Sequence, residues 1–268
     1  MPNRSGIWDL RTQGTAMQGG SWLQRAVFTE GAVSAYSQIL QLDMNSSGTA
    51  RDFGNLSTAR LQAGGAAVGS KTRACFAGGY DGSSSNVIDF ITIFSGGTAT
   101  DFGNMTIAGM HCSGASSNTR GLIGGIWTGA YINTIDFVTI ATAGNASNFG
   151  DLLATAYGTQ GASNSIIGII CGGVSGSAVS NVIQFVTIAT AGDASDFGDL
   201  TTTLAYVGAT SNRIKAVLPG GYNGSALSST IDQVIIATAG NATDWGDLSA
   251  ACSQSGATSN AHGGLSYG

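Results

Sequence analysis

Charged side chains are scarce in this sequence of 268 residues, of which 9% are Asp, Glu, Lys or Arg. A typical soluble protein carries about 25%. The ten basic residues form no cluster, and the formal net charge is −5. A surface that binds nucleic-acid phosphates needs grouped Lys and Arg side chains. We therefore expect no nucleic-acid partner, and a polar surface made mainly of Ser, Thr, Asn and Gln.

Long apolar runs are also missing. No stretch approaches the roughly 18 consecutive apolar residues that a membrane-spanning helix needs. The opening residues, Met1 to Gly6, lack the apolar segment of a secretory signal. We expect no membrane insertion, and a protein that leaves the cell in which it is made by lysis or as part of a particle.

Residues that carry catalysis are few. The chain has two histidines, His111 and His262, and one glutamate, Glu30. It contains no Gly-x-Ser-x-Gly elbow, no His-Glu-x-x-His helix and no phosphate-binding loop with its lysine. The four cysteines are 37, 59 and 81 residues apart, which matches no metal or redox spacing. The sequence predicts a protein that is not an enzyme, with no cofactor and no metal, whose cysteines act as small core hydrophobes.

Glycine is abundant, at 42 residues, and a unit of about 48 residues repeats along the chain. Its marker is the string Asp-Phe-Gly or a close variant. The aromatic residues of the marker step by 49, 47, 48 and 48 positions, and they are Phe53, Phe102, Phe149, Phe197 and Trp245. A fixed period of this length indicates a propeller or a solenoid.

The unit from Cys112 to Ala154 has the pattern of four short strands. A small-residue segment at 112–115 comes first, followed by an apolar segment at 120–125 and a β-branched run at 133–140. This run is apolar on both faces, as expected of a strand packed between neighbouring sheets. A tight two-residue turn is predicted at 143–146, and a last strand at 148–152. Four strands per unit match a propeller blade.

We therefore predict an all-β, five-bladed β-propeller over residues 25–268, with four-stranded blades and an irregular segment at residues 1–24. The marker aromatics are expected to fill the spaces between blades. Paired glycines after the second strand, such as Gly124-Gly125, resemble those of kelch blades. The half-unit at 257–265 would close the ring at the N-terminal unit. A flat solenoid is the alternative, and it would leave edges that need covering.

Acidic residues recur in the marker, for example Asp196 with Asp199 and Asp244 with Asp247. Such pairs supply hard oxygen ligands of the kind that Ca²⁺ takes. Asn replaces Asp in other copies, which keeps the hydrogen bonding and loses the charge. We therefore favour a role in satisfying backbone donors of the turn.

The loop after the paired glycines varies between units, whereas the marker barely changes. These loops are expected to share one rim of the propeller, with aromatic residues beside Asn, Asp and Ser, a mixture suited to sugar faces or a protein partner. In the alternative interpretation Tyr80, Trp127 and Tyr222 only pack over the blade edge. The candidate binding residues are Tyr80, Asp81, Trp127, Tyr131, Tyr222 and Asn223.

The strings at 134–142 and 240–248, with the closing 259–264, resemble repeats found in virion proteins of tailed phages, particularly phages of marine and cyanobacterial hosts. The opening from Gly6 to Trp22 is similar to the start of phage structural and tail proteins. The resemblance covers about residues 25–268. It implies a virion component and supplies no catalytic residues.

Together these features favour a phage structural protein attached to the tail or its fibres, made in the host cytoplasm and released by lysis. Residues 1–24, with Trp8 and Trp22, would dock it on other virion proteins, and the rim would bind host-surface glycans, a receptor or another subunit. Capsid decoration is a close variant. A soluble lectin resembling the tachylectin type is the alternative. A glycan-degrading enzyme would need two carboxylates about 5 to 9.5 Å apart, for which only Glu30 and Asp81 are candidates.

Overall fold

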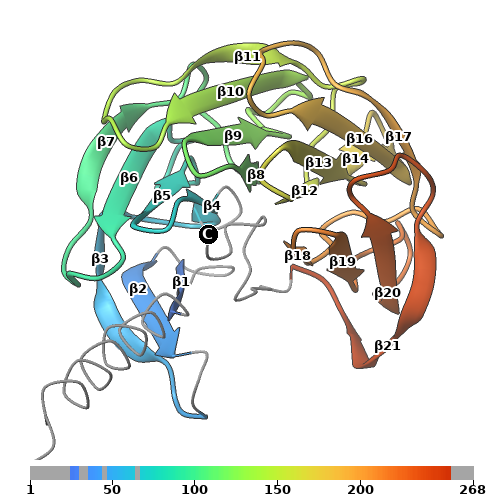
Figure 1. The fold of residues 1–268 in the computed structure, drawn as a ribbon, viewed down its shortest axis with the longest axis horizontal. Helices are drawn as coiled ribbons and strands as arrows, with labels where there is room; N and C mark the ends of the chain where they lie inside the picture. The colour runs from blue at the N-terminus through green and yellow to red at the C-terminus, as the bar shows by residue number, and fades with distance from the viewer. Residues whose placement is uncertain (1–24, 30–35, 44–46, 64–66, 255–268) are drawn as a thin grey trace, which may run out of the picture.

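A computed structural model describes residues 25–29, 36–43, 47–63 and 67–254. These residues form β-strands and connecting loops, and none of them is helical. The strands are grouped in five small antiparallel sheets that are arranged as the blades of a five-bladed β-propeller (Figure 1). The fold class that the repeat predicts is therefore confirmed.

The blades follow one another along the chain, and each is named here by its order. Blade 1 has β1 (Arg25–Thr29), β2 (Tyr36–Asp43) and β3 (Arg51–Arg60). Blade 2 has β4 (Ala67–Gly69), β5 (Arg73–Ala77), β6 (Val87–Thr92) and β7 (Thr100–Asn104). Blade 3 has β8 (Ser113–Ser116), β9 (Arg120–Gly124), β10 (Thr134–Thr139) and β11 (Ser147–Asp151). Blade 4 has β12 (Gln160–Ser163), β13 (Ile167–Cys171), β16 (Val182–Thr187) and β17 (Ser195–Asp199). Blade 5 has β18 (Thr210–Ser211), β19 (Lys215–Pro219), β20 (Ser228–Ile235) and β21 (Thr243–Cys252).

In blades 2 to 5 the strands pair in chain order, and the first strand of each blade lies nearest the centre of the ring (Figure 1). Serine hydroxyls link these inner strands. Ser163 Oγ donates to the Ser116 carbonyl at 2.8 Å, and Ser211 Oγ donates to the Ser163 carbonyl at 2.7 Å. Blade 1 contributes three strands, β1 to β3, to the described structure. The predicted closing segment at 257–265 lies outside the described residues.

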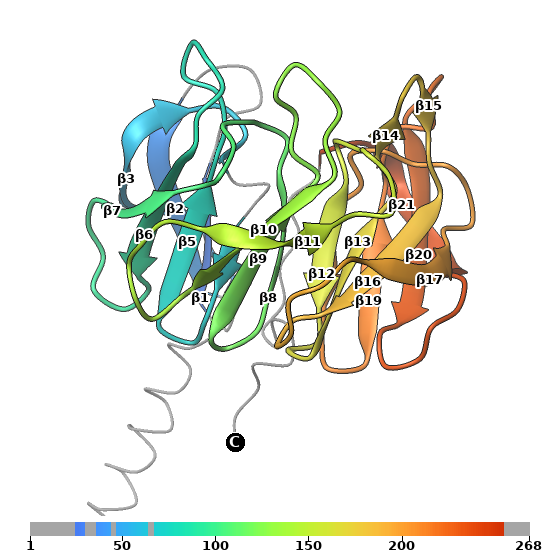
Figure 2. The same cartoon turned by 90° about the horizontal axis from the view of Figure 1, so that it is seen from above.

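The propeller has two different faces. The loops between the second and third strands of the blades project together from one face, at the top of Figure 2. The linkers from one blade to the next lie on that face too, and we call it the rim face. We call the opposite face the hairpin face, because it carries the connections between the third and fourth strands. In the loop of blade 4 a small extra hairpin, β14 (Val174–Ser175) and β15 (Ala178–Val179), extends the rim face.

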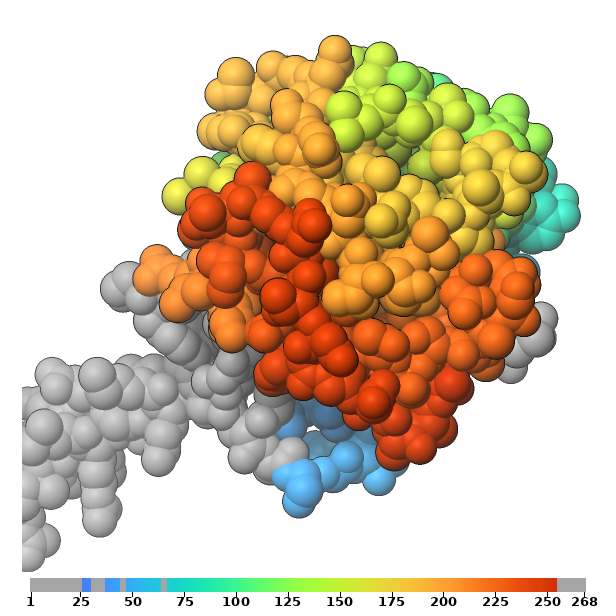
Figure 3. Space-filling model, turned by 90° about the vertical axis from the view of Figure 1, so that its right-hand side faces the viewer, coloured from blue at the N-terminus to red at the C-terminus, as the bar shows by residue number. Residues whose placement is uncertain are grey.

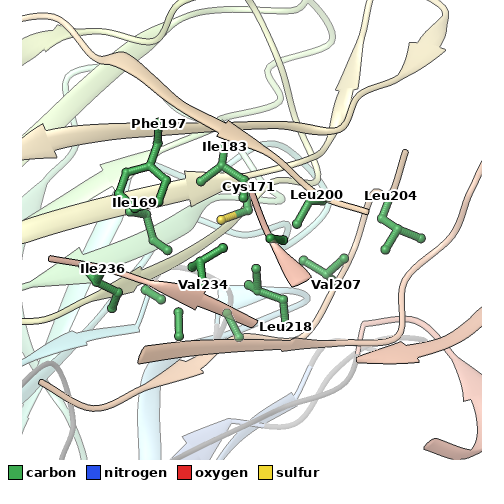
Figure 4. Close-up of a cluster of buried hydrophobic side chains, with 14 residues drawn as sticks. Ile169, Cys171, Ile183, Phe197, Leu200, Leu204, Val207, Leu218, Val234 and Ile236 are labelled. Carbon is green, nitrogen blue, oxygen red and sulfur yellow. The ribbon is translucent and has the colours of Figure 1, made fainter. Parts of the chain in front are cut away.

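The core is divided among the junctions between blades. Four clusters of buried apolar side chains lie between blades 1 and 2, 2 and 3, 3 and 4, and 4 and 5. Figure 4 shows the last of these, in which Phe197 of blade 4 faces Val234 and Ile236 of blade 5. The marker phenylalanines belong to these clusters, and Phe149 is only 2% exposed. Their predicted role as fillers between blades is confirmed.

Trp245 is an exception to that prediction. Its side chain is 60% exposed, although it occupies the same repeat position as the buried phenylalanines. The physical reason is its place in the ring, because the described residues put no further blade against the outer side of blade 5. The prediction that Trp245 fills a junction is therefore wrong for the described chain.

The loop between the third and fourth strands of a blade forms hydrogen bonds with the preceding blade. In blade 3 this loop runs from 140 to 146, so the predicted two-residue turn at 143–146 is wrong. Gly144 N donates to the Phe102 carbonyl at 2.6 Å, and Ala146 N donates to the Asn104 carbonyl at 2.8 Å. Both acceptors belong to β7 of blade 2. The Gly-Asn segment is a contact between blades rather than a local turn.

Each buried third strand also makes a polar link to the blade before it. Asp136 is fully buried and accepts hydrogen bonds from Thr106 N at 2.8 Å and Thr106 Oγ1 at 2.6 Å. Asp232 makes the same pair with Thr201, and Gln184 accepts one from Leu153 N at 2.8 Å. Blade 1 has Leu40 at this position, which cannot accept a hydrogen bond.

Candidate functional site: an aromatic platform on the rim face

The site is built on the linkers that join one blade to the next. In each linker one residue has the left-handed backbone conformation, with φ between 55° and 64°. The residues recur at the repeat spacing, and they are Gln62, His111, Gly158, Tyr206 and Gln254. The linkers that hold the first four of these residues lead into the inner strands of blades 2 to 5, which lie nearest the centre of the ring (Figures 1 and 2). Gln254 is the last described residue.

Backbone hydrogen bonds hold successive linkers together. Tyr206 N donates to the Gly158 carbonyl, and Gln254 N donates to the Tyr206 carbonyl, both at 2.8 Å. Each linker also pairs with the loop that projects beside it. Met110 pairs with Trp127, and Tyr157 with Val174, by antiparallel bridges. The linkers and loops therefore form one continuous surface near the axis.

Five aromatic side chains meet on this surface, and we call them the aromatic platform: His111, Trp127, Tyr131, Tyr157 and Tyr206. Tyr157 is at the centre, with its ring centroid 4.5 Å from Trp127, 5.5 Å from Tyr131 and 5.8 Å from His111. All five are partly exposed. The platform is built from the linkers that lead into blades 3, 4 and 5 and from the projecting loop of blade 3.

Gly158 is what lets the platform extend across three blades. Its φ is +64°, and a Cβ atom there would lie 2.7 Å from the Tyr206 ring. The missing side chain allows Tyr206 to lie over the linker and reach His111, at 5.4 Å between ring centroids. Any larger residue at position 158 would displace Tyr206.

Burial changes the titration of two platform residues. Burial lowers the pKa of His111 below its ordinary value of 6.5, which favours the neutral imidazole. Burial first, and then a hydrogen bond with Tyr157, raises the pKa of Tyr206 above its ordinary value of 10.0. Near neutral pH Tyr206 therefore keeps its proton and His111 is mostly uncharged. The platform is therefore an uncharged surface of rings with hydroxyl and imidazole groups at their edges.

The six binding residues predicted from the sequence are separated by the structure. Trp127 and Tyr131 pack against each other at 5.1 Å, edge to face, and belong to the platform. The remaining four lie in the corresponding loops of blades 2 and 5 and take no part in the ring contacts of the platform, although Tyr222 pairs through its backbone with Ala205, next to Tyr206. They are Tyr80, Asp81, Tyr222 and Asn223.

These four residues have contacts within their own loops. Tyr222 donates its hydroxyl to the Gly224 carbonyl at 2.7 Å. Asp81 accepts hydrogen bonds from Ser83, and Asn223 accepts from the backbone N of Ser225 and Ala226. Such bonds shape the turns.

Sequence reasoning missed His111, Tyr157 and Tyr206. All three lie in linkers between repeats rather than in the projecting loops. Aligning the units shows that two successive linker positions vary. The first holds Leu61, Met110, Tyr157 and Ala205, and the second holds Gln62, His111, Gly158 and Tyr206. That local variability is the signal that was available.

The acids of the marker accept hydrogen bonds from the backbone of their own turn. Asp101, Asp196 and Asp244 each accept a hydrogen bond from the glycine two residues later, at 2.9 to 3.2 Å. Within the described ranges no group of three or more His, Cys, Asp or Glu side chains is placed to hold a metal ion. Glu30, Trp8 and Trp22 lie outside those ranges. No described helix is long and apolar enough to cross a membrane.

No protein-family model matches the chain, and no curated protein does.

Proposed function

We propose that this protein is a structural component of a tailed-phage virion, attached to the tail or its fibres, which presents its rim face to a host-surface glycan, a receptor or another virion subunit. The observation that carries the proposal is the aromatic platform on one face of a propeller whose described chain begins, at Arg25, on the other face. The resemblance of the repeat strings to phage virion repeats supports the same assignment.

The direction of the chain supports attachment through the hairpin face. β1 begins at Arg25, which pairs with Asp43 at the end of β2. Asp43 leads into the connection to β3, which lies on the hairpin face. Residues 1–24 therefore join the propeller at that face. Docking by this segment on a particle would leave the rim face free.

The chemistry of the platform suits a sugar or a polar protein surface. Aromatic side chains with a polar tip combine an apolar ring face with hydrogen-bonding groups. The platform offers several ring faces together with tyrosine hydroxyls and a neutral imidazole. A pyranose ring, with apolar C–H faces and hydroxyl edges, matches both features. The low charge of the chain is consistent with an uncharged ligand.

A soluble lectin is the second candidate, and capsid decoration is a variant of the first. A propeller lectin gains avidity from equivalent sites on its blades. Here the platform uses blades 3, 4 and 5 together, and blades 2 and 5 have different loops at the corresponding positions. One composite site favours a subunit whose avidity comes from many copies on a particle.

Binding of the full chain to host cells and to a glycan array tests the rim-face assignment. Replacing Trp127 with Ala should weaken binding by roughly tenfold or more, because buried aromatic anchors dominate such contacts. Tyr222→Ala is the matched control, since Tyr222 has the same repeat position in blade 5 but its ring makes none of the platform's ring contacts and its hydroxyl donates to the Gly224 carbonyl. Equal binding by the wild type and Trp127→Ala, with both folded, would remove the platform from the proposal.

Mass spectrometry of purified particles tests the virion assignment separately. The chain should co-sediment with particles at a constant ratio to the other tail proteins. Recovery only in the soluble fraction of the lysate, together with glycan binding, would favour the lectin.

A further inference from the structure

The two ends of the row of blades have complementary surfaces that are open. At each of the four junctions inside the chain, the hairpin-face loop of one blade bonds to the outer strand of the blade before it. We call the Gly-x-Ala part of that loop the tab. The strand segment that receives it is called the bay, and it runs from the marker aromatic to the residue after the marker glycine. Among the described residues, the tab of blade 1 has no bay before it, and the bay of blade 5 has no tab after it.

The four filled junctions show how a tab and a bay fit. At the junction of blades 3 and 4, Gly192 N donates to the Phe149 carbonyl and Ala194 N donates to the Asp151 carbonyl, both at 2.8 Å. The Asp193 side chain also accepts from Asp151 N at 3.0 Å. A Cβ atom at Gly150 would lie 2.3 Å from the Gly192 carbonyl, so the bay glycine is required by the tab.

The open tab and the open bay keep the sequence of the filled ones. Gly48-Thr49-Ala50 aligns with Gly97-Thr98-Ala99 of blade 2, which fills the bay of blade 1. Trp245-Gly246-Asp247 aligns with Phe197-Gly198-Asp199. Yet a Cβ atom at Gly246 would meet nothing within 4 Å. The described parts of blades 1 and 5 share none of the tab-to-bay bonds.

Apolar side chains on both surfaces are also uncovered. Phe28 of blade 1 is 39% exposed, whereas Phe76 at the same position of blade 2 is fully buried at the junction with blade 1. On blade 5, Trp245 is 60% exposed, whereas Phe149 and Phe197 at the same repeat position are buried. The outer surface of blade 5, red in Figure 3, faces the viewer. Large apolar side chains that are exposed here and buried at the filled junctions indicate an interaction site.

The charges on the two surfaces are of opposite sign. Arg51 follows the tab of blade 1, where the other blades have Thr or Ser, at positions 100, 147, 195 and 243. The bay of blade 5 carries Asp244 and Asp247, both exposed. At filled junctions the tab alanine bonds to the carbonyl of the residue that aligns with Asp247. A tab of the blade 1 type seated in this bay would therefore bring Arg51 beside Asp247.

From these observations we infer that the bay of blade 5 binds the tab of blade 1 from a second copy of this chain. The occupant must carry a Gly-x-Ala loop and a basic residue after it, and the chain itself supplies both on its other open surface. Each copy then offers one tab and one bay, so the contact is head-to-tail, and it generates a ring or a filament depending on whether the rotation closes. In blade 1, Leu40 stands where the later blades have the buried Asp or Gln that accepts a hydrogen bond from the preceding blade. A junction made by blade 1 with a second copy is therefore more apolar than the four junctions inside the chain.

Cysteine pairs test the inference directly. Thr49→Cys and Asp247→Cys replace exposed residues that align with Asp193 and Asp151, whose side chain and backbone N are 3.0 Å apart. Mixed under oxidising conditions, the two single variants should form a disulfide between chains, seen as a band of doubled mass without reductant. The double variant Asp151→Cys/Asp193→Cys, at a filled junction, is the control and should form its disulfide within one chain.

The assembly itself is followed by sedimentation of the full chain over a range of concentrations. The wild type should form species heavier than the monomer, and Trp245→Ala should shift them to monomer. Ile166→Ala, on an equally exposed residue of the hairpin face, should not.

Two results would overturn the inference. One is a wild-type chain that stays monomeric at all concentrations. The other is a disulfide that forms within one chain of the double variant Thr49→Cys/Asp247→Cys, while the mixed single variants form none. That result would mean that blade 1 contacts blade 5 of its own chain and closes the ring. Neither result bears on whether the rim face binds a glycan, which the Trp127→Ala assay measures.

Discussion

Phe149 shows at the scale of one residue how the junctions are stabilised. It is 2% exposed, and its ring packs edge to face with Phe137 at 6.0 Å between centroids. Phe149→Ala should lower the free energy of unfolding by about 3 to 5 kcal/mol, because it leaves a cavity in a packed core. Thermal and denaturant unfolding measure the loss. A melting curve unchanged by Phe149→Ala would contradict the role of the marker aromatic.

Asp136 tests the polar link between blades 2 and 3. Asp136→Ala should cost about 1 to 3 kcal/mol, because Thr106 would lose the acceptor for its backbone N and its hydroxyl. Burial raises the pKa of Asp136, so its charge is itself costly at neutral pH. Asp136→Asn is therefore expected to lose less, as the amide of Gln184 already makes this link in blade 4. Equal losses in denaturant unfolding would argue against the link.

His111 makes stability depend on pH. Its pKa in the folded chain is lowered by burial, so protonation favours the unfolded chain. The stability that it contributes is complete above the ordinary value of 6.5, and it is lost as the pH falls through the lowered pKa. His111→Asn, which tolerates the left-handed backbone, should lose less stability on mild acidification than the wild type. Parallel acid-induced shifts of the two melting curves would contradict this.

At the residue scale the sequence predicted part of the candidate site. Trp127 and Tyr131 were identified because they lie in a loop that varies between units. His111, Tyr157 and Tyr206 were not, because linkers from different repeats meet only after the ring has formed. Proximity around an axis is not encoded in any local pattern.

At the scale of elements, the loop between the third and fourth strands of each blade joins its sheet to the preceding one through backbone hydrogen bonds. Gly246→Ala should cost about 1 to 3 kcal/mol, from the backbone strain of a side chain at φ +139°. Gly150→Ala should cost about 1 to 3 kcal/mol more, because the same strain is joined by loss of the two hydrogen bonds from the blade 4 tab. Unfolding of both variants at concentrations where the chain is monomeric measures the difference. Equal losses would mean that the tab contributes no stability.

The strands of one unit were predictable because their pattern is local. The segments expected at 112–115, 120–125, 133–140 and 148–152 correspond to β8, β9, β10 and β11. The predicted turn at 143–146 failed because Gly144 and Ala146 bond to the preceding blade instead of across their own hairpin. The β14–β15 hairpin was missed because two-residue strands have no detectable period.

For the whole molecule, the period of the marker was enough to predict five blades, since each unit needs a neighbour to bury its apolar face. It did not predict that the blade 1 and blade 5 surfaces are open. Trp245 looked like another junction residue because the sequence repeats without marking which copy is last. Ring closure by 257–265 remains a prediction, as those residues lie outside the described chain.

A cryo-EM map of the particle with which this chain purifies tests the proposed function most directly. We expect five-lobed density attached through the hairpin face, where the described chain begins at Arg25, with the surface around Trp127 and Tyr157 turned away from the particle. Density with the rim face buried against the particle, or particles that lack the chain altogether, would contradict it.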